Sequence, residues 1–405
     1  MNKEQLLDAF IETGNSVERF RELLKEIAAA TTLTNAETRD FQLFSIREIN
    51  EGEGVVIFHV YDYEQSVKNE PPKLAKIKTG ALSDLLGENG YEEFLTKTRF
   101  LLWHNSVMYF PSQNALGGLA ARAELSGYGV FDPAHELFAL LARRFERDSQ
   151  EATLVVRNAG KLKKLVACMS KRYAYVQQKL MCDIMDGFAE DMGSEPVCTG
   201  WEVSQFFTRV YFDFPEKADD FAKTYALPSN ITPGICLYTS DTGDASFTAT
   251  GFYNIGRNRI PFNIYRKKHS GLVDVKGIQN SIKHTVFDRY TKLPQRLCEL
   301  INIPIDKPRE VTEGILDQIG FIEEAGKRIG GKLVEVIISE YNSSIPYTAY
   351  DIAMSIMSIP GRFTDGAEST LRKIEAVVYK AAYADYARAI KEAESDFVLP
   401  PEIAA

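Results

Sequence analysis

The stretch that decides the fold class runs from Ile231 to Tyr265 and reads ITPGICLYTSDTGDASFTATGFYNIGRNRIPFNIY. It contains short runs rich in β-branched and aromatic residues, which are typical of strands, at 231–238, 246–253 and 259–265. Aspartates and a glycine at 241–244 form a turn signal between the first two runs. This pattern predicts consecutive antiparallel strands joined by tight turns.

Further runs of the same kind lie upstream and extend the expected sheet, at 153–157, 163–169, 197–203 and 206–214. One helix is expected to interrupt them at about 175–190, where apolar side chains recur every fourth residue. The segments before residue 151 and after residue 271 have mainly helical periodicity, apart from a β-hairpin around 51–54. The predicted fold class is α+β, with a central, mainly antiparallel sheet flanked by helical N- and C-terminal parts.

The chain of 405 residues exceeds the size at which a single hydrophobic core stops growing, about 250 to 300 residues. We expect three parts: 1–150, mostly helical with a β-hairpin; 151–300, the sheet-rich core; and 301–405, helical. Gly330 and Gly331 are expected to break the first long helix of the last part.

The cysteines and the apolar runs indicate where the protein works. The five cysteines are widely spaced and form no CxxC pair, which argues against a disulfide framework and a zinc cluster. The N-terminus lacks the basic region and apolar run of a signal peptide, and no stretch approaches ~18 consecutive apolar residues. We therefore expect a cytoplasmic protein without a membrane partner.

The net charge of −9 hides an uneven distribution of positive charge. Residues 157–179 hold seven Lys/Arg and no acid, and residues 257–296 hold ten Lys/Arg against two acids. We call these stretches basic segment 1 and basic segment 2. Both contain aromatic residues as well. Because cations neutralise phosphates and flat side chains stack on unpaired bases, this mixture favours single-stranded nucleic acid over an intact duplex.

The candidate nucleic-acid-binding residues are cations, aromatics and one histidine of the two basic segments: Arg157, Lys161, Lys163, Lys164, Lys171, Arg172, Tyr173, Arg257, Arg259, Tyr265, Arg266, Lys267, Lys268 and His269. In the alternative interpretation, the aromatic side chains pack in the core and the cations form a solvated face. A single binding surface requires the two segments to meet in the fold.

Two acidic groups contain oxygen ligands of the kind that a divalent cation prefers. Asp183, Asp186 and Glu190 share one face of the expected helix, and residues 240–244 form an expected turn. We favour a solvated face and an ordinary hairpin turn over metal binding. The chain also contains no GxxxxGK[ST], GxGxxG or GxSxG motif. We therefore expect no catalytic residue, no metal and no cofactor, and hence no enzyme.

Several short elements between Asn114 and Arg296 occur in a familiar order: ATLVVR at 152–157, SKRY at 170–173, PGI at 233–235, Ser240-x-x-Gly243 and HSG at 269–271. In this order they resemble the phage/plasmid-like family, a domain of unknown function carried by bacteriophages, prophages and conjugative plasmids. Thr239 departs from that pattern, since the family has an asparagine before the serine. The resemblance implies a mobile-element origin, and hence the cytoplasm of a bacterial host cell, and no established reaction.

These observations lead to a first hypothesis of a phage- or plasmid-type DNA-metabolism protein. It would bind single-stranded DNA through a basic-aromatic surface and act as a homo-oligomeric annealing or protective factor. The alternative is a non-enzymatic phage structural or host-interaction (anti-defence) protein. A metal-dependent nuclease that uses the acidic groups is a third possibility.

Overall fold

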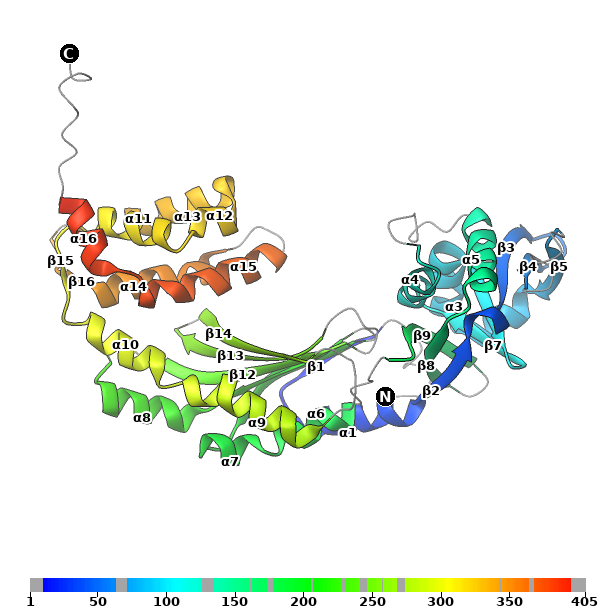
Figure 1. Cartoon of the computed structure of the whole chain (residues 1–405), viewed down its shortest axis with the longest axis horizontal. Helices are drawn as coiled ribbons and strands as arrows, with labels where there is room; N and C mark the ends of the chain where they lie inside the picture. Colours follow the sequence, from blue (N-terminus) through cyan, green and yellow to red (C-terminus); the bar gives the residue numbers. More distant parts are fainter. Residues whose placement is uncertain are drawn as a thin grey trace, which may run out of the picture.

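The computed structural model describes residues 10–62, 71–125, 135–159, 162–172, 178–204, 207–227, 231–240, 246–256, 258–267, 274–342, 344–363 and 368–394. In this part of the chain, helices and strands combine in an α+β fold, which confirms the predicted fold class (Figure 1). The described strands form three sheets, of six, eight and two strands, where the sequence predicted one central sheet.

The six-stranded sheet, sheet A, is antiparallel throughout in the order β1-β10-β11-β12-β13-β14. Its strands are β1 (Ile11–Gly14), β10 (Val197–Ser204), β11 (Thr208–Asp213), β12 (Ile231–Thr239), β13 (Phe247–Ile255) and β14 (Asn258–Lys267). The hairpins read from the central sequence are confirmed. Strand β1 forms one edge by pairing with β10, although helical periodicity was expected there.

One face of sheet A is covered by helices, below the sheet in Figure 1. These are α1 (Val17–Ala30), α6 (Gln178–Met185), α7 (Phe188–Met192), α8 (Pro215–Tyr225), α9 (Val275–Thr285), the 3₁₀ helix η3 (Phe287–Arg289) and α10 (Lys292–Leu300). Alternate strand residues such as Val210, Ile235 and Ala249 are fully buried in the core beneath. Because side chains alternate along a strand, their neighbours point to the opposite face.

The C-terminal helices stand over that opposite face. They are α11 (Pro308–Gln318), α12 (Phe321–Ala325), α13 (Lys327–Ser339), α14 (Ala349–Met357), η4 (Ile359–Arg362), α15 (Glu368–Val378), η5 (Tyr379–Tyr383) and α16 (Tyr386–Glu394), with a small sheet of β15 (Pro304–Ile305) and β16 (Tyr347–Thr348).

The predicted helix break at Gly330–Gly331 is wrong. The chain turns at Gly320 and Gly326, whose φ values of 70° and 82° favour glycine. Gly330 lies inside α13, where an added Cβ would come within 2.9 Å of Ile322.

The N-terminal part is built on the eight-stranded sheet, sheet B, in the order β2-β8-β9-β7-β6-β3-β4-β5. Its strands are β2 (Thr31–Glu37), β3 (Gln42–Asn50), β4 (Val55–Tyr61), β5 (Lys73–Lys78), β6 (Phe100–His104), β7 (Val107–Pro111), β8 (Glu151–Ala159) and β9 (Leu162–Ser170). Its helical segments are η1 (Thr38–Asp40), α3 (Thr79–Glu93), η2 (Phe94–Thr98), α4 (Gln113–Arg122) and α5 (His135–Arg147). The predicted hairpin is confirmed as β3 and β4.

Two expectations about this part are wrong. It is not mostly helical, and the division after residue 150 cuts through sheet B, because β8 pairs with β2 and β9 pairs with β7. Helix α4 reinforces that pairing by packing closely on β9. An added Cβ on Gly118 would lie 2.4 Å from the carbonyl oxygen of Cys168.

Among the described helices, none has both the length and the apolar character needed to cross a lipid bilayer.

Candidate nucleic-acid interface

Basic segment 1 belongs to sheet B, and two of its cations are buried. Arg157 and Lys164 each expose 1% of their surface. The Lys164 ammonium donates to a carboxylate oxygen of Glu93 at 2.9 Å, and the Arg157 guanidinium lies 5.8 Å from the centre of the Phe10 ring. The expectation that these two residues lie on an exposed binding surface is therefore wrong. A charged side chain is rarely buried to this degree unless it interacts with a partner inside the protein.

The other described candidates of basic segment 1 differ in their exposure. Lys163 is half-buried, while Lys171 and Arg172 are exposed. Lys171 is paired with Glu151. Lys161 and Tyr173 lie outside the described residues.

Basic segment 2 begins in β14 of sheet A. Arg259, Arg266 and Lys267 are at least partly exposed on this strand. Tyr265 packs against the core beneath the sheet, with its ring 6.5 Å from that of Phe247, so it does not share a face with Arg266. Arg257, Lys268 and His269 lie outside the described residues.

The aromatic side chains further along basic segment 2 are internal. Phe287 and Tyr290 expose 6% and 2% of their surface. The Tyr290 hydroxyl donates to the carbonyl oxygen of Gly234 at 2.5 Å, beneath the sheet. The alternative interpretation, in which aromatics pack in the core, is confirmed for these two residues.

The strand cations of the two basic segments therefore occupy different sheets, as Figure 1 shows for β9 and β14, although basic segment 1 ends in α6, which contacts α9 of basic segment 2. Strand β14 is the edge of sheet A opposite β1, and α1, which follows β1, contacts β2 and β8 of sheet B. Five inter-strand spacings separate the two edges of sheet A, or about 24 Å. The strand cations of the two segments, on β8 and β9 and on β14, thus do not form one continuous surface.

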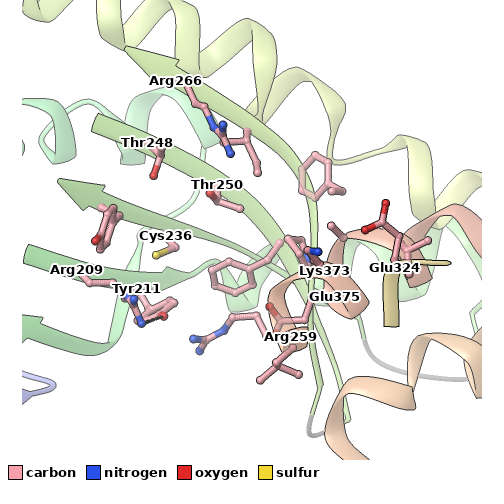
Figure 2. A pocket seen from close by; sticks show the side chains of 18 of the residues that line it. Arg209, Tyr211, Cys236, Thr248, Thr250, Arg259, Arg266, Glu324, Lys373 and Glu375 are labelled. Atoms are coloured by element: carbon pink, nitrogen blue, oxygen red, sulfur yellow. Dashed lines mark hydrogen bonds between the residues drawn. The ribbon is translucent and has the colours of Figure 1, made fainter. Parts of the chain in front are cut away.

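A cleft of 890 Å³ lies between the second face of sheet A and the C-terminal helices (Figure 2). Strands β11 to β14 form its floor with Arg209, Tyr211, Cys236, Tyr238, Ser246, Thr248, Thr250, Phe252, Arg259, Pro261, Phe262, Ile264 and Arg266. Helices α12 and α15 and the segment η5 form its wall with Glu324, Leu371, Lys373, Glu375, Ala376, Val377 and Lys380. Of these lining residues, five are basic and two are acidic.

The floor of the cleft is organised in rows that cross the strands. The register pairs Arg209 with Tyr238, Tyr238 with Thr248, and Thr248 with Arg266. Residues opposed in this way lie about 4.5–5.5 Å apart on one face of a sheet. One row therefore begins and ends with a guanidinium and holds an aromatic ring and a hydroxyl between them. We call it the arginine row.

A second row runs beside the arginine row. It pairs Tyr211 with Cys236, Cys236 with Thr250, and Thr250 with Ile264. Burial raises the pKa of the Tyr211 hydroxyl, so this group stays protonated and able to donate a hydrogen bond. The second row thus carries an aromatic hydroxyl, a thiol, a threonine hydroxyl and, on the edge strand, an apolar side chain.

Two of the cleft arginines are stacked against aromatic rings. The guanidinium carbon of Arg209 lies 5.4 Å from the ring centres of both Phe207 and Tyr238. The guanidinium carbon of Arg259 lies 4.0 Å from the centre of the Tyr211 ring and 4.6 Å from that of Phe252. Stacking holds the guanidinium plane in place, and its N–H donors lie in that plane. The site thus contains fixed, planar cations.

The position of Arg259 is fixed further by its polar neighbours. Its Nε donates to the side-chain oxygen of Asn254 at 3.5 Å, and the Asn254 amide donates to Asp213 at 2.8 Å. Burial raises the pKa of Asp213, while Asn254 and Arg259 act in the opposite direction. Glycine at position 234 admits the Phe252 ring, because an added Cβ there would lie 2.3 Å from that ring.

A smaller cleft of 560 Å³ continues the polar face towards β1. Tyr211 and Arg259 line both clefts. The other residues of the smaller cleft come from the start of the described chain and from β10: Thr13, Gly14, Asn15, Thr199, Gly200, Trp201 and Glu202. The face available to a ligand therefore extends across sheet A from β14 to its opposite edge.

The acidic side chains considered as metal ligands between Asp183 and Glu190 do not share one continuous helix. The expected helix over 175–190 is interrupted at Asp186–Gly187, where α6 gives way to α7. The Asp186 carboxylate accepts a hydrogen bond from Arg21 at 2.5 Å. Within the described ranges, no three His, Cys, Asp or Glu side chains cluster as a metal site. The turn over 241–245 lies outside those ranges.

Sequence reasoning identified Arg259 and Arg266 but missed most of the cleft. The strands that contain Arg209, Tyr211 and Tyr238 hold few cations. Counting charge along the sequence therefore does not identify these three residues. The signal that could have found Arg209 and Tyr211 is alternation, since polar or aromatic residues occupy every second position of β11, as they do in β13.

Comparison with known proteins adds no relative from which a function could be transferred. No protein-family model matches this chain, and no curated protein or solved structure matches it either. The function is therefore inferred from the chemistry of the cleft.

Proposed function

We propose that this protein binds single-stranded DNA in the cleft over the open face of sheet A. The observation that carries the proposal is the arginine row, in which Arg209 and Arg266 flank Tyr238 and Thr248 on four adjacent strands. Guanidinium groups pair with phosphate oxygens, often through two parallel hydrogen bonds. Aromatic rings and guanidinium planes offer stacking surfaces to unpaired bases.

The cleft suits a single strand better than a duplex. Bases in a duplex stack on one another, so their faces cannot contact Tyr238 or Tyr211, whereas a single strand can turn its bases towards the floor. The C-terminal helices form a wall beside that floor. Threonine hydroxyls at 248 and 250 donate and accept hydrogen bonds without selecting one base.

The resemblance of residues 114–296 to the phage/plasmid-like family favours a setting in phage or plasmid DNA metabolism. In that setting, a protein that holds single strands would serve as an annealing or protective factor. Such factors commonly work as assemblies, so the proposal includes a homo-oligomer. Size-exclusion chromatography with light scattering, with and without an oligonucleotide, tests this part separately.

The binding proposal is tested by fluorescence anisotropy with a labelled single strand at about 50 mM and about 200 mM salt. Single-stranded RNA of the same sequence and the DNA duplex are run beside it. We expect the single DNA strand to bind most tightly and its affinity to fall steeply with salt. Absence of binding at low salt would overturn the proposal, and tighter binding of RNA would overturn the choice of DNA.

Matched variants locate the site. Arg209→Gln with Arg266→Gln removes two cations from the cleft, whereas Lys171→Gln with Arg172→Gln removes two exposed cations from the N-terminal part. We expect the first pair to weaken binding at least tenfold and the second pair to leave it within about twofold. The reverse order would place the interface on basic segment 1.

A further inference from the structure

The wall of the cleft differs from its floor in chemistry. Lys373, Ala376, Val377 and Lys380 are spaced by three, four and seven residues, so they share one helical face, and all four line the cleft. Lys373 and Lys380 are exposed. The floor opposite carries Tyr211, Tyr238 and other aromatic side chains. Figure 2 shows Lys373 and Glu324 on the side opposite Arg209 and Tyr211.

The wall is anchored to the edge of sheet A. Ile374 and Val378 of α15 are fully buried, and α15 contacts β14. The Tyr379 ring lies 6.0 Å from that of Phe262 in β14, and its hydroxyl donates to the Tyr383 hydroxyl at 2.8 Å. Lys373 and Lys380 are therefore held at a set position beside the floor, before any ligand arrives.

We infer that α15 and η5 form a phosphate-contacting wall of the cleft: phosphates of a bound single strand contact Lys373 and Lys380 in addition to the guanidinium groups at the two ends of the arginine row, and its bases face the aromatic side chains of the floor. This inference rests on the proposed function. A lysine is a compact point charge that suits a phosphate, whereas a ring offers a surface to a base and no charge to a phosphate. The inference assigns a specific role to the C-terminal helices, which the sequence did not single out.

The assignment predicts different salt dependences for the two sides of the cleft. Each phosphate contact on a single strand contributes about 0.7 to the slope of log affinity against log salt. Removing both lysines should therefore lower the slope by about 1.4. Removing floor aromatics should weaken binding at every salt concentration and leave the slope unchanged, because stacking releases no counterions.

The test compares three double variants in anisotropy titrations with an oligo-dT strand over a series of salt concentrations. Lys373→Gln with Lys380→Gln changes the wall, and Tyr211→Leu with Tyr238→Leu changes the floor. Lys327→Gln with Lys332→Gln is the matched control, because these exposed lysines of α13 do not line the cleft but carry the same charge. Circular dichroism establishes that each variant is folded.

The expected result is a slope lowered by about 1.4 only in the wall variant, with affinity at low salt weakened several-fold. An unchanged slope in the wall variant, while the wild-type chain binds the strand, overturns the inference alone. An equal change in the α13 control also overturns it, since a general loss of charge would then be the cause. If the wild-type chain fails to bind at low salt, the proposed function itself fails.

Discussion

The guanidinium carbon of Arg259 lies 4.0 Å from the centre of the Tyr211 ring. These two residues stand where the 890 Å³ cleft meets the 560 Å³ cleft, since both residues line both spaces. A bound strand that extends from one cleft into the other therefore passes over this pair. The stack fixes a flat cation at the point through which a continuous ligand must run.

Replacing Arg259 with lysine should weaken DNA binding about tenfold, which corresponds to about 1.4 kcal/mol. Lysine keeps the positive charge but cannot stack a plane between Tyr211 and Phe252. Anisotropy titration at a fixed salt concentration measures the loss. Arg388→Lys, at an exposed position of α16 paired with Glu392, is the control and should bind like the wild type. Wild-type affinity in Arg259→Lys would mean that charge alone matters at this position.

Substitution of Gly234 with alanine should destabilise the fold by about 1–3 kcal/mol. The new Cβ would lie 2.3 Å from the Phe252 ring and 2.7 Å from the carbonyl oxygen of Phe212, so the ring must move away from Arg259. Thermal unfolding measures the stability, and anisotropy should reveal weaker DNA binding in the same variant.

Gly117→Ala is the control for that substitution. Gly117 lies inside α4, and an added Cβ there meets nothing within 4 Å. Alanine in a helix is favoured over glycine by about 1 kcal/mol, so this variant should be as stable as the wild type or more so. Equal destabilisation of both variants would contradict the steric explanation for Gly234.

Bound single-stranded DNA should protect Cys236 from alkylation by a maleimide. Cys236 is half-buried in the floor of the cleft, whereas Cys298 is half-buried outside it. Mass spectrometry of peptides should detect at least a several-fold lower rate at Cys236 with DNA and an unchanged rate at Cys298. Cys168 should remain unmodified in all samples, because burial raises the pKa of its thiol to about 12. Equal protection of Cys236 and Cys298 would argue against binding in the cleft.

Replacing Lys164 with methionine should destabilise the protein by about 3–5 kcal/mol, because the partly buried Glu93 carboxylate loses its 2.9 Å partner. The double variant Lys164→Met with Glu93→Leu should recover much of this loss, since neither charge is then left alone. Thermal unfolding checks the order of the three proteins. DNA affinity of the folded variants should stay unchanged, and a marked loss of affinity would return Lys164 to the interface.

The sequence determined the local structure of this protein to a large extent. Alternation of β-branched and aromatic residues between Ile231 and Tyr265 predicts β12, β13 and β14, and their hairpin pairing follows from the short turns between them. Charge counting also found Arg259 and Arg266, because these cations belong to a dense run. Alternation and charge density can be recognised in the sequence because both depend only on residues that are close together in the chain.

Only the tertiary structure decided which residues face the cleft. Arg157 and Lys164 resemble surface cations in the sequence, yet contacts with Phe10 and Glu93, far away in the chain, make them internal. Packing also decided which residues line the cleft. The members of the arginine row come from four strands, and α15 brings Lys373 over β14. Burial and cross-strand neighbours depend on how distant segments pack, and no local pattern of charge or periodicity encodes that packing.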